Sequence, residues 1–252
     1  MAIRFSNFLG QNKNLEILEQ KGPFTVFHHL EDLSTTPSTA QTKFFMAQTN
    51  CTVKQLLARC PQGIKTQAGA MQLMVGSLEM TTGVKGVGDL VGKAFKGKAS
   101  GESTIKPEYK GSGWILCEPT YKFLLLEDLA DWNGSLVCDD GMFYAAELSV
   151  KDTIQMRQNL SSVAGGKGLF NCLMKGQGIV ALESYYPRNE LYTVDIQNDV
   201  LKVDGSNVVC WSGTLQFTVE RSGKTLVGSA VSGEGLVNVY RGTGRVLMAP
   251  RT

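Results

Sequence analysis

Apolar and polar residues alternate along several stretches of the chain. Between residues 192 and 197 every second side chain is apolar, and the same alternation returns between residues 215 and 220. Successive side chains of a β-strand point to opposite faces, so a period of two predicts strands with one buried face. Such a face must pack against another sheet. The pattern therefore predicts an all-β protein whose sheets form a β-sandwich.

A Gly-x-Gly sequence occurs three times at nearly constant spacing. The pairs lie 65 and then 66 residues apart, and they are Gly111/Gly113, Gly176/Gly178 and Gly242/Gly244. An apolar segment follows each pair, and glycine tolerates the positive φ that tight turns need. We therefore predict three tandem repeats, each with a Gly-x-Gly hairpin before its last strand.

The spacing also predicts the domain organisation. We expect residues 1–252 to form a single body, because no Pro/Ser-rich linker separates the repeats. Residues 1–52 stand outside the repeat, with strands expected at 24–29 and 43–48 and a loop at 34–38. The three repeats are placed at 53–119, 122–184 and 190–250.

The first repeat carries an insertion of about five to seven residues, around 83–100. Its apolar residues follow the spacing of one face of a short helix, and its lysines outnumber its single aspartate. One interpretation is a surface that contacts a protein partner or a membrane, formed by Leu90, Lys93, Phe95, Lys96 and Lys98. The other is a helix that covers one open end of the sandwich, with solvated lysines.

Charge and targeting signals narrow the function classes. Lys and Arg number 25 against 23 Asp and Glu, so no overall field exists to attract nucleic acid or anionic lipid. The start of the chain lacks the apolar core of a signal peptide, and no segment approaches the roughly 20 apolar residues of a membrane span. We expect a cytoplasmic protein whose six scattered cysteines are buried, reduced thiols.

Candidate catalytic and metal-binding residues do not form a convincing constellation. The glycine-rich 83–98 segment misses the spacing of both the P-loop and the dinucleotide motif. His28 and His29, expected at the surface or on an edge strand, point to opposite faces and cannot easily chelate one ion together. Cys172 has no histidine near it in sequence. We expect no catalytic residue, no metal and no cofactor.

Several short segments resemble a known family. The most specific is Gly233-Glu-Gly-Leu-Val-Asn-Val-Tyr-Arg-Gly-Thr-Gly-Arg-Val-Leu-Met248, and the others are Ala68-Gly-Ala-Met71, Gly101-Glu102, Gly-Leu-Phe-Asn171 and Val203-Asp-Gly205 with Trp211. Over residues 50–250 the chain resembles bacterial members of the altered-inheritance-of-mitochondria protein 24 family, of TRAP-like fold. The resemblance implies a triplicated β-sandwich with pseudo-threefold symmetry. Each unit would be similar to one subunit of the tryptophan-responsive RNA-binding attenuator.

The resemblance supplies no activity, since the family is uncharacterised. Our leading hypothesis is a non-enzymatic binding or scaffold protein, with an unknown protein partner or with self-association through sheet edges. The alternative is a small-ligand binder or enzyme with a site in the pseudo-threefold interior, using Asp140, Asp204 or Glu234. RNA binding is disfavoured, because the three repeats share no Lys/Arg motif.

Overall fold

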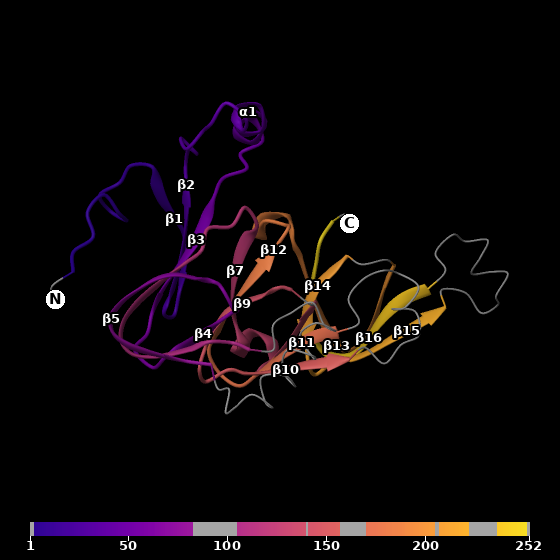
Figure 1. The fold of residues 1–252 in the computed structure, drawn as a ribbon. Helices are drawn as coiled ribbons and strands as arrows, with labels where there is room; N and C mark the ends of the chain where they lie inside the picture. The colour runs from indigo at the N-terminus through magenta and orange to yellow at the C-terminus, as the bar shows by residue number, and fades with distance from the viewer. Residues whose placement is uncertain are drawn as a thin grey trace.

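The computed structural model describes residues 3–82, 105–139, 141–156, 170–204, 207–221 and 236–250 (Figure 1). Within these ranges the regular structure is almost wholly β-strand, which confirms the all-β prediction. The first sheet has nine strands, in the order β1 (Leu15–Lys21), β2 (Phe24–His29), β3 (Lys54–Arg59), β6 (Glu108–Cys117), β4 (Ile64–Thr66), β9 (Phe143–Glu147), β12 (Ile179–Ser184) and β7 (Phe123–Asp128), with β5 (Met71–Thr81) paired to β6. The second has seven strands, in the order β10 (Lys151–Met156), β11 (Phe170–Lys175), β8 (Ser135–Asp139), β14 (Val208–Ser212), β16 (Leu236–Met248) and β13 (Tyr192–Asp204), with β15 (Gln216–Arg221) paired to β16.

One set of antiparallel pairings occurs three times along the chain. In the first set β6 pairs with β3, β4 and β5. In the second set β12 pairs with β7 and β9, and β11 pairs with β8 and β10. In the third set β16 pairs with β13, β14 and β15. A register shift recurs at the same place, where β5 meets β6, β9 meets β12 and β14 meets β16.

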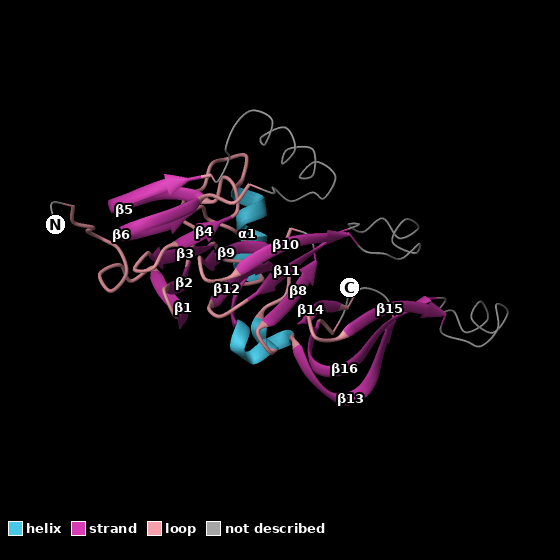
Figure 2. Ribbon diagram, turned by 90° about the horizontal axis from the view of Figure 1, so that it is seen from below, coloured by secondary structure: helices cyan, strands magenta, loops and turns pink. Residues whose placement is uncertain are grey.

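Two further pairings link the three sets in a row. β4 of the first set pairs with β9 of the second, and β8 of the second pairs with β14 of the third. β5 and β13 lie on opposite sides of the molecule in Figure 2. The boundaries of the repeats and their pseudo-threefold arrangement stay predictions.

The predicted Gly-x-Gly hairpins are wrong. The first glycine pair lies inside β6 and the third lies inside β16, so both strands continue through them. Only Gly176/Gly178 forms a connection, and it joins β11 to β12, which belong to different sheets. The first glycine of each pair, Gly111, Gly176 or Gly242, has a φ of 122°, 120° or 116°, a region that other residues rarely adopt. The glycines therefore bend a strand path that would otherwise run straight.

Three apolar clusters fill the interior of the described chain. One lies inside the curled nine-stranded sheet and includes Leu56 and Ile115, and another lies inside the seven-stranded sheet around Trp211. The third joins the two sheets and includes Phe143 from the first and Cys138 from the second. The prediction of buried cysteines is confirmed for five of the six, whereas Cys51 is only partly buried, and none of the six forms a disulfide.

The strand predicted at 24–29 is confirmed as β2, but the strand predicted at 43–48 is wrong. These residues belong to α1 (Ala40–Gln48), whose sequence is rich in the helix formers Ala, Gln, Lys and Met. Phe44 and Phe45 are 61% and 58% exposed, so no sheet face buries this segment as a strand. Two short 3-10 helices, η1 (Leu129–Trp132) and η3 (Arg188–Glu190), complete the helical elements of the described ranges. None of their helices is long and apolar enough to cross a membrane.

Substitution of the bending glycines should cost stability unequally. A Cβ at Gly111 would lie 2.2 Å from the Ser77 carbonyl oxygen, whereas at Gly242 the nearest atom is 3.9 Å away. Gly242→Ala should cost about 1–3 kcal/mol through backbone strain alone. Gly111→Ala should cost more, because the backbone of β5 must also move. Urea unfolding of both variants measures the difference, and equal losses would contradict this account of the bend.

Candidate functional site

The N-terminal segment, residues 3–13, covers part of the outer face of the nine-stranded sheet. Four consecutive residues of β2 are buried, which a strand with one solvated face would not show. Phe24 and Val26 belong to the core, whereas Phe27 points to the other side of the sheet and is fully buried. Phe8 packs edge-on against Phe27, with ring centroids 5.7 Å apart. The segment therefore closes part of a face that the repeat strands leave open.

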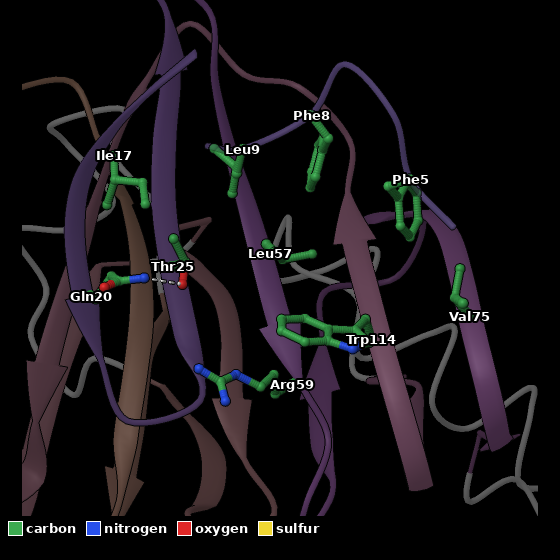
Figure 3. A pocket seen from close by; sticks show the side chains of 10 residues that line it. All are labelled: Phe5, Phe8, Leu9, Ile17, Gln20, Thr25, Leu57, Arg59, Val75 and Trp114. Carbon is green, nitrogen blue, oxygen red and sulfur yellow. Dashed lines mark hydrogen bonds between the residues drawn. The ribbon is translucent and has the colours of Figure 1, made fainter. Parts of the chain in front are cut away.

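An apolar groove of about 360 Å³ lies between this segment and the strands (Figure 3). β1, β2, β3, β5 and β6 each contribute to its wall. The lining is apolar except for an amide, a hydroxyl and a guanidinium, and consists of Phe5, Phe8, Leu9, Ile17, Gln20, Thr25, Leu57, Arg59, Val75 and Trp114. Ligand sites in proteins commonly have this size and this excess of apolar lining.

The polar groups of the groove gather at one end. The Arg59 guanidinium lies over the Trp114 ring, 5.1 Å from its centroid, and Gln20 Nε2 donates to Thr25 Oγ1 at 3.1 Å (Figure 3). No carboxylate within the described ranges forms an ion pair with Arg59. The groove thus combines an apolar lining with one cation that stacking holds in place.

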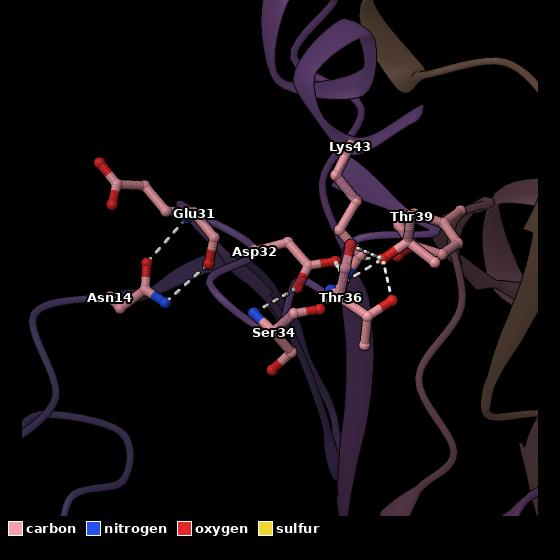
Figure 4. Close-up of polar contacts among 8 residues, drawn as sticks. Asn14, Glu31, Asp32, Ser34, Thr36, Thr39 and Lys43 are labelled. Atoms are coloured by element: carbon pink, nitrogen blue, oxygen red, sulfur yellow. Dashed lines mark hydrogen bonds and ion pairs between the residues drawn. The ribbon is translucent and has the colours of Figure 1, made fainter. Parts of the chain in front are cut away.

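A second, polar depression of about 310 Å³ lies beside the loop that precedes α1. Asp32 accepts hydrogen bonds from Lys43 Nζ at 2.6 Å, from Tyr121 Oη at 3.0 Å and from the Ser34 amide at 3.2 Å. The bond from Lys43 is the main cause that lowers the Asp32 pKa. Figure 4 shows Asp32 with Ser34 and Lys43 beside it. They occupy the carboxylate and anchor the loop and α1, so we assign this depression a structural role.

A buried charge cluster joins the first and second sets of strands. Lys106 Nζ lies 2.9 Å from Asp152 Oδ2 and 4.2 Å from the ring centroid of Phe143, and Lys65 Nζ bonds to the other oxygen of Asp152. Both lysine side chains are less than a tenth exposed. Burial by itself would raise the pKa of Asp152, but the two ammonium groups outweigh it and lower that pKa. The carboxylate is therefore ionised and neutralises part of a buried positive charge.

The two histidines bond to protein groups on different sides. His28 Nδ1 lies 3.0 Å from Thr52 Oγ1 and its Nε2 lies 3.0 Å from Glu16 Oε2, whereas His29 bonds to Gln55. Among the residues that the structure describes, no three His, Cys, Asp or Glu side chains are grouped to hold a metal ion. Of the two predicted positions, surface or edge strand, the edge strand is wrong, because β2 lies between β1 and β3, and both histidines are partly exposed.

Three buried thiols, those of Cys60, Cys117 and Cys210, lie in surroundings that disfavour the thiolate. Burial raises the pKa of Cys60 to about 11 and that of Cys117 to about 12, and it also raises the pKa of Cys210. Cys172 is 1% exposed within the cluster between the sheets, 3.9 Å from Lys106 Nζ. Since the thiolate is the nucleophile, the raised pKa values of Cys60, Cys117 and Cys210 favour a structural over a reactive role for these three cysteines.

Most of the residues predicted to contact a partner or ligand lie outside the described ranges. These are the surface Leu90, Lys93, Phe95, Lys96 and Lys98, and the carboxylates Asp140 and Glu234. Asp204, the third of those carboxylates, is exposed at the end of β13 and pairs with Val237. Sequence reasoning missed the groove, although the phenylalanines at 5 and 8 outside the repeat were a signal for it.

These observations define the class of the protein, which is an all-β protein with two curled sheets and an apolar groove. Residues 46–251 match the family model described as mitochondrial biogenesis AIM24, and the chain belongs to this family. The chain is also similar in fold to a crystal structure of a Streptococcus pyogenes protein, with a TM-score of 0.57 and 20% identity over 94% of both chains. No curated protein matches it.

Removal of the central carboxylate of the charge cluster should destabilise the fold strongly. Asp152→Asn removes the carboxylate charge that faces two buried ammonium groups, which should cost about 3–5 kcal/mol in the free energy of unfolding. Glu108→Gln is the matched control, because its pair with Lys110 is exposed and should contribute less than about 1 kcal/mol. Urea unfolding at neutral pH compares the two, and similar losses would contradict the assigned burial.

The same carboxylate should make stability depend on acid pH. The folded pKa of Asp152 lies below its ordinary value, so its contribution is complete above the unfolded pKa of about 3.9. That contribution is lost as the pH falls through the lowered folded pKa. The stability difference between wild type and Asp152→Asn should therefore shrink in acid. A difference that stays constant from neutral pH to pH values below the folded pKa would contradict this prediction.

Proposed function

We propose that this chain is a non-enzymatic binding protein whose groove takes a small amphiphile with an apolar body and an anionic group. The observation that carries the proposal is the apolar lining with Arg59 at one end, stacked on Trp114. Transfer of an aliphatic chain from water into such a lining is favourable by about 0.8 kcal/mol for each methylene buried. The guanidinium supplies a donor with the geometry that a carboxylate prefers.

The surroundings of the reactive residue types support a non-enzymatic role. Both histidines are bonded to protein side chains, and the thiol pKa values of Cys60, Cys117 and Cys210 are raised rather than lowered. Apart from Arg59, whose guanidinium stays protonated, none of the lining residues is an acid or a base. A binding role uses what the groove offers, namely shape, apolar surface and one positive charge.

Calorimetric titration with dodecanoate, below its critical micelle concentration, tests the proposal. Wild type should bind with a saturable isotherm, and Arg59→Gln should weaken binding about tenfold, which corresponds to about 1.4 kcal/mol. Dodecanol has the same chain without the charge, so its affinity should be equal for wild type and Arg59→Gln. Arg241→Gln, remote from the groove in β16, is the matched control and should bind dodecanoate as wild type does.

Leu57→Asp provides the second arm, since it places a carboxylate inside the apolar lining. It should abolish binding of both probes while the far-UV circular dichroism spectrum remains that of wild type. Absence of saturable binding to wild type, or unchanged dodecanoate affinity in Leu57→Asp, would refute the groove as the binding site.

A further inference from the structure

We infer that copies of this chain assemble head to tail, with β13 of one copy pairing with β5 of the next. The inference is independent of the ligand of the groove. It rests on the two pairings that already join the strand sets inside the chain, β4 with β9 and β8 with β14. Each contact joins a strand of one set, which we call the donor strand (β4 or β8), to a different strand of the next set, which we call the acceptor strand (β9 or β14).

These two contacts use neither the donor strand of the third set, which is part of β13, nor the acceptor strand of the first set, which is part of β5. Residues 199–204 of β13 are equivalent to β4 and β8. Each of the three pairs with the part of β6, β11 or β16 that comes before the bend at the Gly-x-Gly sequence. Residues 71–75 of β5 hold the place of β9 and β14, because all three share the same register shift. Within the described ranges no strand pairs with the outer edge of either segment. Figure 3 shows β5, which carries Val75, as the outermost strand of the groove wall.

On the acceptor strands, the residues that face a donor strand within the chain are buried, whereas the equivalent residue at the open edge is exposed. Ala146 in β9 and Trp211 in β14, which face the donor strands, are 0% and 4% exposed. Met74 holds the same place in β5 and pairs with the buried Ile115, so its side chain lies on the core side of the sheet. It is nevertheless 40% exposed, because the edge ends there.

The donor strands show the same difference. Lys65 in β4 and Val137 in β8 are each 7% exposed, and they pair with Ala146 and Trp211. Lys202 is their counterpart in β13 and is exposed, and the neighbouring Val200 is 46% exposed. Exposed apolar side chains therefore lie at both open edges, and a second copy would cover them as the internal contacts do.

The internal registers predict the contact between copies residue by residue. Lys65 pairs with Ala146 and Val137 pairs with Trp211, so Lys202 of one copy should pair with Met74 of the next. Such a contact uses two different surfaces, so it repeats from copy to copy until a ring closes or a filament forms. It differs from a twofold dimer, in which one surface meets itself.

Backbone hydrogen bonds show which amides point to the partner. Gln67 N donates to Tyr144 O at 2.7 Å, and Gly213 N donates to Ser135 O at 2.7 Å. Each of these bonded pairs lies two residues along the ladder from the pair Lys65–Ala146 or Val137–Trp211. Hydrogen-bonded pairs alternate along antiparallel strands, so these two pairs, which correspond to Lys202 and Met74, are also hydrogen-bonded. The amides of Lys202 and Met74 should therefore point outward. Proline at either position would remove a bond to the neighbouring copy and leave the bonds to β16 or β6 intact.

Native mass spectrometry and light scattering of the full chain test the assembly. Wild type should have the mass of several chains, whereas Lys202→Pro and Met74→Pro should each have the mass of one. Lys202→Ala and Met74→Ala are the controls, because they change the side chain and keep the amide, and they should assemble. A 1:1 mixture of the two proline variants should form a complex of two chains and no larger species, since each variant retains one intact edge.

Several results would overturn the inference. They are a single-chain mass for wild type at all concentrations, assembly of a proline variant as in wild type, or a mixture that stays as single chains. Circular dichroism and thermal unfolding check that the proline variants fold. If they do not, Met74→Lys should weaken assembly and Met74→Glu should strengthen it, each by roughly two- to fivefold in dissociation constant, because the residue lies opposite Lys202. Equal effects of the two charges would overturn the register.

Discussion

Three bent strand paths organise the sheets, and each bends at a glycine with φ near +120°. β6, the pair β11 and β12, and β16 follow these paths, and every strand from β3 onward pairs with one of them. The bend allows the first half of a path to pair with one group of strands and the second half with another. Because only glycine adopts this backbone shape at little cost, its position decides where the sheet curls and where the interior apolar clusters form.

The two internal contacts between strand sets are built from different chemistry. The first buries Lys65 against Asp152, and the second buries Val137 beside Trp211. A buried ion pair is a weak source of stability, because both charges lose their hydration. It disfavours wrong registers of the strands, since a shift of one residue would turn Lys65 to the opposite face of the sheet and separate it from Asp152. We interpret the charged contact as one that specifies register and the apolar contact as one that adds stability.

The N-terminal region supplies what the repeated strands lack. β1 and β2 extend the nine-stranded sheet beyond β3, and residues 3–13 cover its outer face. The groove forms where this cover is incomplete, between Phe5 and Phe8 on one side and Trp114 on the other. A repeated β body thus becomes a binding protein in our proposal through a segment that is not repeated. The open edge of β5 borders the same groove, so assembly and binding would share one strand.

Local patterns in the sequence determined the all-β class, the strand at 24–29, the positions of the bending glycines and the burial of the cysteines, because each depends on alternation or on the properties of one residue type. Tertiary structure decided the rest. Residues 43–48 have an alternation-free apolar content that suits either a strand or a helix, and the absence of a sheet to bury Phe44 and Phe45 leaves them in α1. The Gly-x-Gly sequences marked a backbone with positive φ. Whether the chain turns back there or continues as a strand depends on the neighbouring strand, because β5 and β13 pair with β6 and β16 on both sides of the glycines. The groove brings together Phe5 and Trp114, 109 positions apart, and the charge cluster brings together Lys65 and Asp152, 87 positions apart. Only packing brings such distant positions into contact.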